Sequence, residues 1–353
     1  MKIGIFNPYL DTLGGGEKYT LTAAWCLSKI HEVCLFWDSK EVIKKAHYLF
    51  ALDLSKIKLT ENIFSLKIPL AKRLLKTQKY DVIIYVSDGS IPLSFASKNI
   101  LIFQFPVNWV NGKNFLTRLK LSRINRVICY SQFVKGFLDK TFSVDSLVLP
   151  PAINIPKNKS VQKENIILTV GRFTKGMNTK KQEVLIDTFK SMCSKGLANW
   201  KFILVGGVLP GDWDFVEELK NKTKGYPIEI LNNISFQKLA SFYKKAKIYW
   251  HAAGFGEDLE KHPEKAEHFG VTTVEAMASG CVPVVINAGG QKEIVQEGRN
   301  GMLWDTLEEL KRKTMLLNEN DSLRKRLSGN AQDSSKQYGV ERFCSELYEI
   351  VET

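Results

Sequence analysis

Apolar runs the length of a β-strand alternate with helical patterns along the whole chain, and this alternation limits the folds open to it. A first set of such runs occupies residues 2–6, 33–36, 82–86, 100–103, 127–129 and 146–149. A second set occupies residues 166–170, 202–205, 228–231, 248–250 and 282–286. Strands that alternate with helices usually lie parallel in one sheet, with helices packed on its faces. The sequence therefore predicts an α/β protein.

The two sets of strands are separated by a break near the middle of the chain. Pro150-Pro151 interrupts the pattern, and residues 156–160 read as a polar linker. A chain of 353 residues suggests two domains of about 150–200 residues each. We expect two Rossmann-like domains, 1–155 and 156–335, that face each other across a cleft. Residues 336–353 should form a helix, and the sequence leaves open whether it crosses back to the first domain.

Most of the positive charge lies in the first half of the chain. Residues 1–150 contain 21 Lys and Arg against 11 Asp and Glu, a balance of +10 out of +13 for the whole chain. The basic residues gather in two groups interleaved with apolar ones: Lys67, Lys72, Arg73, Lys76 and Lys79, then Lys113, Arg118, Lys120, Arg123 and Arg126. Such a surface could contact an anionic membrane or an anionic acceptor, and the alternative is an ordinary solvated face. Nucleic acid is not expected, because no recognition motif accompanies the charge.

No segment predicts secretion or membrane insertion. The longest apolar runs, such as residues 82–86, fall short of the roughly 18–20 residues that span a bilayer. The first residues read as a strand and not as a signal peptide. The cysteines, which are Cys26, Cys34, Cys129, Cys193, Cys281 and Cys344, lack C-x-x-C spacing. We therefore expect free thiols in a reducing cytoplasm rather than a disulfide framework.

The segment from Glu267 to Gly280 carries the strongest functional signal. Glu267 and Glu275 have seven residues between them, and Phe269-Gly270-Val271 lies at the start of the helix that contains the second. The first N–H groups of a helix can donate to anionic oxygens, and the carboxylates can accept hydrogen bonds from hydroxyls. The alternative is a capping acid followed by an exposed helical glutamate. With a Gly280 turn and Gly289-Gly290 behind it, the pattern favours a site for a ligand with hydroxyls and a diphosphate.

Three further residues follow predicted strands or open predicted helices. Arg172 comes just after the strand at 166–170, and Lys180 lies at the start of the next helix. Both could converge on one diphosphate, or each could be an ordinary surface charge. His251 ends the strand at 248–250 and either touches a ligand or serves the structure. The acidic loop that follows it matches no standard set of metal ligands, so no metal is expected.

Glycines open the first predicted helix. Gly14-Gly15-Gly16 follows the first strand after a loop, and glycines there let the backbone approach a phosphate or a sugar. The alternative is a simple turn. The pattern is not G-x-G-x-x-G, which counts against a nicotinamide dehydrogenase.

Taken together, these segments resemble the family 4 retaining glycosyltransferases of bacteria and archaea, which have the GT-B fold. The resemblance covers most of the chain and is strongest over residues 248–304. It implies that Glu275 hydrogen-bonds the ribose of a sugar nucleotide and that Glu267 contacts the donor sugar. The N–H groups of Phe269, Gly270 and Val271 would approach the sugar or a phosphate.

The resemblance also assigns roles outside the glutamate segment. Arg172 and Lys180 would hold the diphosphate, and Lys180 matches the family's lysine better than Lys181 does. Ile234 falls where the family's backbone contacts the base. Gly15 and Gly16 would close over the diphosphate and the acceptor from the first domain.

The implied reaction transfers a hexose from a nucleotide diphosphate sugar to a hydroxyl and keeps the anomeric configuration. The sequence looks most like mannosyl- and other hexosyltransferases, so GDP-mannose is the first choice of donor and a UDP-hexose the second. The acceptor would be a glycan or a polyprenyl-diphosphate-linked oligosaccharide, with the basic first domain at the cytoplasmic membrane face. No cofactor or metal is implied, because Arg172 and Lys180 would take the part of a cation.

The chain departs from the family at one position. Many relatives carry a histidine at the end of the fourth strand, where this sequence has Gln104. Glutamine forms hydrogen bonds but does not titrate, so we expect at most a hydrogen bond to the sugar there.

Two other functions are open to the sequence. One is a nucleotide-sugar epimerase on a similar scaffold. The other is a non-catalytic module that binds a sugar nucleotide or a lipid surface.

Overall fold

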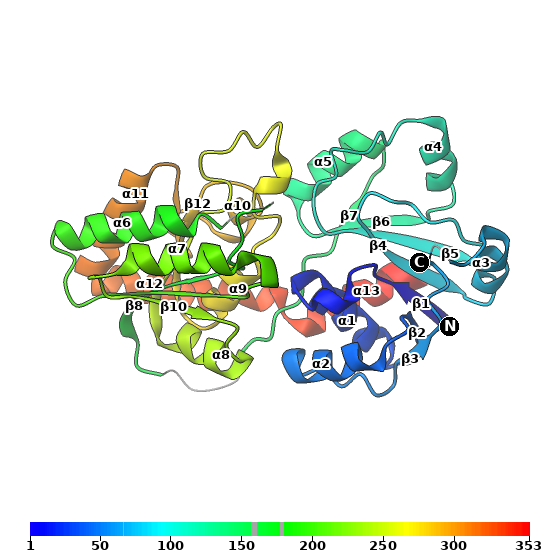
Figure 1. The fold of residues 1–353 in the computed structure, drawn as a ribbon, viewed down its shortest axis with the longest axis horizontal. Coiled ribbons are helices and arrows are strands. Elements are labelled where there is room, and N and C mark those ends of the chain that lie inside the picture. The colour runs from blue at the N-terminus through cyan, green and yellow to red at the C-terminus, as the bar shows by residue number, and fades with distance from the viewer. Residues whose placement is uncertain (66, 157–160, 177–179) are drawn as a thin grey trace. The chain divides into compact units, whose positions relative to one another are not determined.

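The computed structural model describes residues 1–65, 67–156, 161–176 and 180–353. The chain divides into two compact units (Figure 1). Unit 1 contains Met1–Ala152 and Val340–Thr353, and unit 2 contains Ile153–Gly339. Of the linker predicted at 156–160, residues 157–160 lie outside the described part of the chain. Each unit is an α/β layer structure around a parallel sheet, so the predicted fold class is confirmed.

Unit 1 is built on a parallel sheet whose described strands follow the order β3-β2-β1-β4-β5-β6-β7. The strands are β1 (Lys2–Phe6), β2 (Glu32–Phe36), β3 (Lys58–Thr60), β4 (Val82–Ser87), β5 (Lys98–Phe103), β6 (Arg126–Cys129) and β7 (Leu147–Val148). The helices are α1 (Gly15–Leu27), α2 (Lys40–Phe50), α3 (Leu70–Thr77), α4 (Phe115–Leu121), α5 (Gln132–Phe142) and α13 (Val340–Glu352). The sequence does not predict β3, because it is short and holds a single large apolar residue.

The core of unit 1 follows from the continuous apolar character of its central strands. Every residue of β4 is buried, and Ile83 and Tyr85 join Leu101 and Phe103 of β5 in one hydrophobic cluster. A parallel sheet is covered on both faces, so its strands are apolar without alternation. This explains why the first set of runs could be recognised without a period of two.

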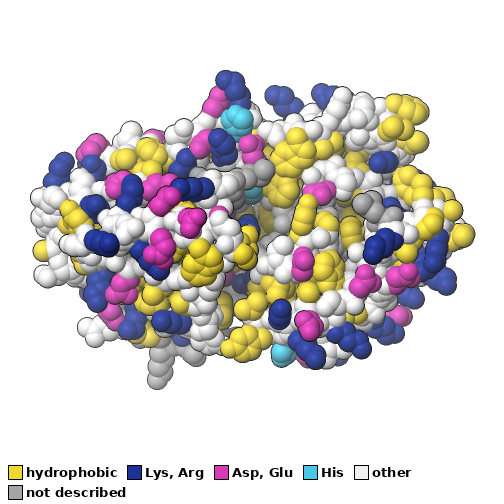
Figure 2. All heavy atoms as spheres, viewed as in Figure 1, with side chains coloured by type: hydrophobic (Ala, Val, Ile, Leu, Met, Phe, Trp, Pro, Cys, Tyr) yellow, Lys and Arg dark blue, Asp and Glu magenta, His cyan; other side chains and the backbone are white. Residues whose placement is uncertain are grey.

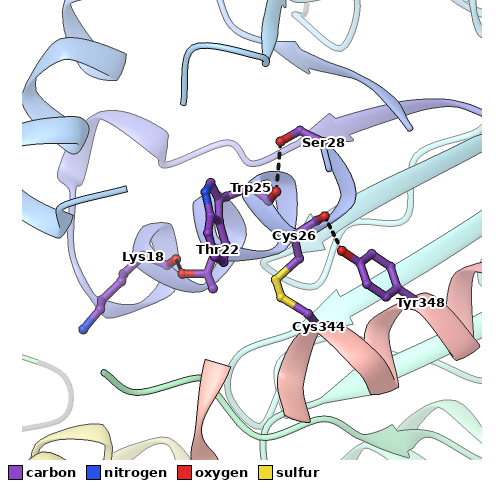
Figure 3. Close-up of a disulfide and its surroundings, with 7 residues drawn as sticks. All are labelled: Lys18, Thr22, Trp25, Cys26, Ser28, Cys344 and Tyr348. Atoms are coloured by element: carbon purple, nitrogen blue, oxygen red, sulfur yellow. Dashed lines mark hydrogen bonds between the residues drawn. A yellow bond between two sulfur atoms is a disulfide. The ribbon is translucent and has the colours of Figure 1, made fainter. Parts of the chain in front are cut away.

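Helix α13 belongs to unit 1, although the whole of unit 2 precedes it in the chain. It packs on α1, where Cys344 forms a disulfide with Cys26 across 318 residues of sequence (Figure 3). Beside it, the Tyr348 hydroxyl donates to the carbonyl of Cys26 at 2.6 Å. The expectation of free thiols is therefore wrong for these two cysteines. Sequence spacing cannot reveal the pair, because only the return of α13 to α1 brings the two side chains together.

Unit 2 repeats the plan of unit 1 with a second parallel sheet. Within the described residues its strand order is β10-β9-β8-β11-β12-β13. The strands are β8 (Glu164–Val170), β9 (Lys201–Gly206), β10 (Ile228–Asn232), β11 (Ala246–His251), β12 (Val282–Ile286) and β13 (Met302–Trp304). The helices are α6 (Gln182–Ser194), α7 (Trp213–Thr223), α8 (Phe236–Lys245), α9 (Val271–Ala278), α10 (Gln291–Ile294), α11 (Leu307–Glu319) and α12 (Asp321–Ser335). The three-residue strand β13 is not predicted by the sequence.

Aromatic side chains fill the core of unit 2. Trp250 of β11 lies fully buried against Phe202 of β9 and Phe189 of α6, with ring centroids 5.3 and 6.5 Å away. Its indole N–H donates to the Thr314 hydroxyl at 3.1 Å, so the buried donor is satisfied. Among the described helices, none is both long and apolar enough to cross a membrane.

The strand orders place a switch point in each unit. In unit 2 the chain builds outward from β8 to β9 and β10, then returns to the other side of β8 to form β11. In unit 1 the same reversal occurs between β1 and β4. Connections leave the carboxyl ends of the two central strands in opposite directions, and open α/β sheets bind their ligands there. The candidate site should therefore lie at the carboxyl ends of β8 and β11.

Candidate functional site

Unit 2 brings most of the predicted site residues to the carboxyl edge of its sheet. Arg172 follows β8, and His251 is the last residue of β11. Lys180 lies just before α6, and Glu267 lies in the loop that leads into α9. The two central strands and two helix starts thus converge, as the switch point requires.

A carboxylate with two partners forms the centre of this edge. Glu267 Oε2 accepts from Lys180 Nζ at 2.6 Å and from His251 Nε2 at 2.7 Å. The side chains of Lys180 and Glu267 are 17% and 15% exposed, so the pair is shielded from bulk water but still reachable. Such a charge-assisted pair is stronger than one in open solvent. The three residues form a rigid polar cluster whose remaining donors and acceptors can meet a ligand.

The protonation states of the cluster follow from its surroundings. Burial alone would raise the pKa of Glu267, but the Lys180 ammonium and the His251 hydrogen bond outweigh it and hold that pKa well below its usual range. Burial lowers the pKa of His251 despite the carboxylate beside it. Its Nδ1 accepts from the Ala253 N–H at 3.4 Å, so the neutral ring carries its proton on Nε2. Glu267 is therefore an anionic hydrogen-bond acceptor near neutral pH.

Both ring nitrogens of His251 are engaged within unit 2. The side chain is 2% exposed and makes its contacts to Glu267 and Ala253. Of the two interpretations that the sequence leaves open, this arrangement favours a structural role in orienting Glu267. Direct contact with a ligand would require one of these hydrogen bonds to break.

A second ion-pair cluster anchors the start of α6. Glu257 accepts from Lys181 and Lys265 at 2.6 and 2.7 Å, and chiefly these two hydrogen bonds lower its pKa to about 2. Lys181, the N-cap of α6, has a left-handed backbone with φ of 55°, which a non-glycine residue adopts only when its surroundings hold it. The two consecutive lysines therefore form ion pairs with different carboxylates, Lys180 with Glu267 and Lys181 with Glu257.

The acidic loop after β11 uses its charges in these and similar pairs. Asp258 contacts Lys261 at 3.0 Å, and His262 lies 3.2 Å from Glu264. Within the described residues, no group of three His, Cys, Asp or Glu side chains could hold a metal ion. That the chain works without a metal stays a prediction.

The start of α9 depends on a glycine. Gly270 is the N-cap, with φ of +118°, and a Cβ there would lie 2.8 Å from Gln291 Nε2. Both the backbone conformation and the lack of space therefore require glycine. The first-turn N–H groups of α9, with Val271 at its first position, add the positive end of the helix dipole to this edge. Phe269 is buried with its ring 5.3 Å from Tyr338.

Two tyrosines hold α9 in register with the sheet. The Tyr249 hydroxyl, from β11, donates to Thr272 Oγ1 at 2.7 Å in the first turn of α9. The Tyr243 hydroxyl, from α8, donates to Glu275 Oε2 at 3.2 Å. Glu275 is partly buried, so it can accept further hydrogen bonds from a ligand. Neither tyrosine is singled out by the sequence, because both read as ordinary core aromatics.

Gly289 and Gly290 act through packing on the loop that carries Glu267. A Cβ on Gly289 would lie 2.4 Å from the Glu267 carbonyl oxygen, and one on Gly290 would lie 2.6 Å from Phe269 Cα. The Gly290 N–H also donates to that Glu267 carbonyl at 2.8 Å. The glycine pair therefore lets the end of β12 approach the loop and hold the carboxylate in place.

Two predicted residues stand apart from the central cluster. Arg172 is exposed, and no described residue pairs with its guanidinium, although its carbonyl accepts from Gln182 Nε2 at 2.9 Å. Ile234 is partly buried between β10 and α8. It follows Asn233, whose left-handed backbone (φ of 51°) and side-chain bond to the Val208 N–H shape the turn. Both residues lie at carboxyl ends of strands in the same sheet.

The remaining predicted residues belong to unit 1, at its own switch point. Gly14 is the N-cap of α1, and Glu17 Oε2 accepts from its N–H at 2.8 Å. A Cβ on Gly16 would lie 1.9 Å from Gln104 Oε1, so the glycine and the glutamine after β5 are in direct contact. Gly15, in contrast, has nothing within 4 Å of such a Cβ. The structure thus separates a glycine that makes room for Gln104 from one that faces open space.

Comparison with known proteins assigns the family. The model of the family described as glycosyl transferases group 1 matches residues 152–334, just over half of the chain. An uncharacterised glycosyltransferase of Haemophilus influenzae is 25% identical over 98% of each chain. One of Methanocaldococcus jannaschii is 27% identical over 69% of this chain and 64% of its own.

Another relative, which aligns over a shorter stretch, has a named reaction. The GDP-Man:Man(3)GlcNAc(2)-PP-Dol alpha-1,2-mannosyltransferase of Dictyostelium discoideum is 30% identical over 50% of this chain. The alignment covers 36% of that relative, so the present chain matches only about a third of its length.

Solved structures share the fold at low sequence identity. A glycosyltransferase from Rickettsia africae has a TM-score of 0.79 and 19% identity, with 99% of this chain and 97% of the other covered. Anabaena HepE in complex with UDP has a TM-score of 0.73 and 20% identity over the full length of both chains. These likenesses and the two parallel sheets show a two-domain α/β fold of the GT-B type. Together with the family match, they place this chain in the glycosyl transferases group 1 family.

Proposed function

We propose that this protein transfers a hexose from a nucleotide diphosphate sugar to a hydroxyl group, with retention of the anomeric configuration, as a family 4 enzyme. The observation that carries the proposal is the cluster of Glu267, Lys180 and His251 at the carboxyl ends of β8 and β11. It combines an anionic acceptor for sugar hydroxyls with a cation for phosphate oxygens, beside the N-terminus of α9.

The proposed diphosphate site uses two cations of different character. Lys180 is held by Glu267, but an ammonium has three donors, so two remain for phosphate oxygens. Arg172 is exposed and pairs with no described residue, so its planar guanidinium can bind two phosphate oxygens at once. Charge grows on the phosphate as the sugar departs, and cations placed in advance stabilise that charge most.

The proposed sugar site rests on the charge state of Glu267. Its pKa lies well below the usual range, so it accepts hydrogen bonds from sugar hydroxyls and does not act as a general acid near neutral pH. A reaction in which the leaving phosphate oxygen takes the acceptor proton needs no protein acid. Such a front-face transfer would keep the anomeric configuration, as proposed.

The nucleoside would occupy the opposite end of α9. Glu275 would accept from the ribose hydroxyls while Tyr243 orients its carboxylate. Backbone at Ile234 would contact the base, and the backbone N–H groups of Phe269, Gly270 and Val271, at and just before the start of α9, would approach the sugar or phosphate. Gly15, Gly16 and Gln104 of unit 1 would contribute to the diphosphate and acceptor side.

Mannose is the proposed sugar, with GDP-mannose as donor. The name of the Dictyostelium relative, a GDP-mannose-dependent enzyme acting on a dolichol-diphosphate-linked oligosaccharide, supports both the donor and a glycan or polyprenyl-diphosphate-linked acceptor. A UDP-hexose is the second candidate, because the similar Anabaena structures hold UDP and UDP-glucose. The protein would work in the cytoplasm without a metal, at the membrane face where a lipid-linked acceptor lies.

A thermal-shift screen against nucleotides and nucleotide sugars identifies the donor, because only a ligand of the folded state raises the melting temperature. The predicted result is a shift with a nucleotide diphosphate hexose that Arg172→Ala greatly reduces. Lys261→Ala, which removes an exposed lysine of the same unit, should leave the shift intact. Equal shifts in all three proteins would refute the assignment of the diphosphate to Arg172.

Measured turnover then separates transferase from the other functions. Donor consumed only when an acceptor is present supports transfer, and epimerisation of donor alone would support the epimerase. If Glu267→Ala transfers sugar as fast as the unmodified enzyme, the catalytic assignment fails. Binding without any turnover would favour the non-catalytic module.

A further inference from the structure

Two short helices of unit 1 present large apolar side chains to solvent. On α4, Phe115 is 78% exposed, Leu116 67% and Leu119 55%, and on α3, Leu75 is 63% exposed and Leu70 49%. Such side chains normally lie inside a protein, and several close together mark a site of interaction. In Figure 2, hydrophobic side chains gather over α3 and α4 with Lys and Arg side chains among them.

The two helices belong to one continuous surface. Phe95, 47% exposed, lies between them in the segment before β5. Its N–H donates to Thr77 Oγ1 at the end of α3 at 2.9 Å, and the Arg123 guanidinium just after α4 lies 6.0 Å from its ring centroid. We call this surface the docking face. It comprises Leu70, Leu75, Phe95, Phe115, Leu116 and Leu119.

The charge around the docking face is predominantly positive; Glu61, which pairs with Lys76 of α3, is an acid beside it. Residues 62–80 and residues 89–138 contain no Asp or Glu at all, whereas the second of these segments contains seven Lys and Arg. Some cations there serve the fold: Arg73 donates to the carbonyls of Ile63 and Phe64, and Arg118 donates to that of Phe142.

Other cations around the docking face have no carboxylate partner within the described residues. They are Lys79, Lys113, Lys120 and Arg123. Because residues 62–80 and 89–138 contain no acid, the positive charge of these side chains is not compensated by nearby carboxylates of the same segments.

We propose that the docking face binds the surface of an anionic phospholipid bilayer. Phe and Leu side chains would enter the boundary between headgroups and acyl chains, while the lysines contact phosphate groups. A second copy of this chain fits poorly, because two faces of the same positive sign would repel each other. The proposal concerns unit 1 and does not depend on the donor chemistry of unit 2.

The test is sedimentation of the full chain with lipid vesicles. Vesicles of phosphatidylcholine with roughly one third phosphatidylglycerol should bind the protein, and vesicles of phosphatidylcholine alone should bind it far less. Raising the salt from about 0.1 M to about 1 M shortens the screening length from about 10 Å to about 3 Å and should release it.

Variants locate the binding surface. Lys113→Gln with Lys120→Gln should weaken vesicle binding about 25-fold, since each lysine contributes about fivefold. Phe115→Ser with Leu116→Ser should weaken it at least about tenfold and leave the melting temperature unchanged, because both side chains are exposed. The matched control is Lys44→Gln with Lys45→Gln on α2, which removes the same charge from exposed positions of the same unit.

Three results would overturn the proposal. Equal binding to neutral and anionic vesicles would remove the role of charge. An equal loss in the α2 control would show diffuse electrostatic attraction without a docking face. If the Phe115 and Leu116 substitutions instead convert a dimer to a monomer in size-exclusion chromatography, a second copy of the chain covers the surface.

Discussion

Replacing Lys180 with methionine removes one partner of Glu267 and keeps the volume of the side chain. In the unmodified protein Lys180 Nζ lies 2.6 Å from Glu267 Oε2, and the side chains of both residues are more than four-fifths buried. Breaking a fully buried pair costs about 3–5 kcal/mol, because a charge is left without its partner. His251 still donates to the same oxygen, so we expect Lys180→Met to lower the free energy of unfolding by about 1–3 kcal/mol at pH 7.

The effect on stability should depend on pH with a definite sign. Lys180 helps to hold the pKa of Glu267 below its ordinary value of 4.5. A lowered carboxyl pKa stabilises the folded state above the ordinary pKa, and this stabilisation is lost as the pH falls toward the folded-state pKa. In the variant Lys180 no longer offsets the rise in pKa that burial causes, so the Glu267 carboxyl takes up its proton at a higher pH than in the unmodified protein. The stability difference between the two proteins should therefore shrink as the pH falls below about 4.5.

Activity should fall much further than stability. Loss of one charge-stabilising donor in an active site typically costs about 100- to 1000-fold in kcat, and we expect this range for Lys180→Met under conditions where the variant is folded. Urea unfolding at several pH values and initial-rate kinetics measure the two effects. Lys220→Met serves as the control, because its pair with Glu217 is exposed and should contribute less than about 1 kcal/mol. A variant as active and as stable at pH 7 as the unmodified enzyme would refute the central role of this pair.

Four other substitutions test three separate parts of the structure. Gly16→Ala should displace the Gln104 side-chain amide at the end of β5 and reduce transfer with little loss of stability, and Gly15→Ala, which has free space around it in the protein, should leave the melting temperature unchanged; kinetics of Gly16→Ala and melting temperatures of both variants decide this. Cys344→Ser should lower the free energy of unfolding by about 2–4 kcal/mol in oxidising buffer, a difference that a reductant should abolish. Glu257→Gln should raise the KM for the donor, because Lys181 at the start of α6 loses its carboxylate partner. In the unmodified protein the Glu257–Lys181 pair should weaken as the pH falls from 4.5 toward 2. An unchanged KM in the variant would show that this pair does not affect donor binding.

The sequence predicts the architecture well because its signal is local. Strands buried on both faces of a parallel sheet are continuous apolar runs, so β4 and β12 can be recognised from five or six residues. The strands β3 and β13 are absent from the sequence prediction, because three residues carry too little pattern. The glutamate segment is likewise local, since Glu267 and Glu275 lie on one loop and helix.

The sequence could not show contacts between residues that are distant along the chain and that only the fold brings together. Lys180 and Glu267 are 87 residues apart, and their ion pair exists only because β8 and β11 are neighbours in the sheet. The choice between Lys180 and Lys181 depends on one left-handed residue at the start of α6. The Cys26–Cys344 disulfide depends on the return of α13 to unit 1. The spacing of the cysteines predicts free thiols, which is wrong for Cys26 and Cys344 and correct for Cys34, Cys129, Cys193 and Cys281.

The most direct test of the central claim is proton NMR of the first product formed from GDP-mannose, or from the hexose donor that the thermal screen selects. We expect release of the nucleoside diphosphate and a product with the same anomeric configuration as the donor, and Glu267→Gln should slow formation of this product by at least about 100-fold. An inverted product would contradict retention, and a Glu267→Gln enzyme with unchanged rate would contradict the assignment of sugar transfer to this site.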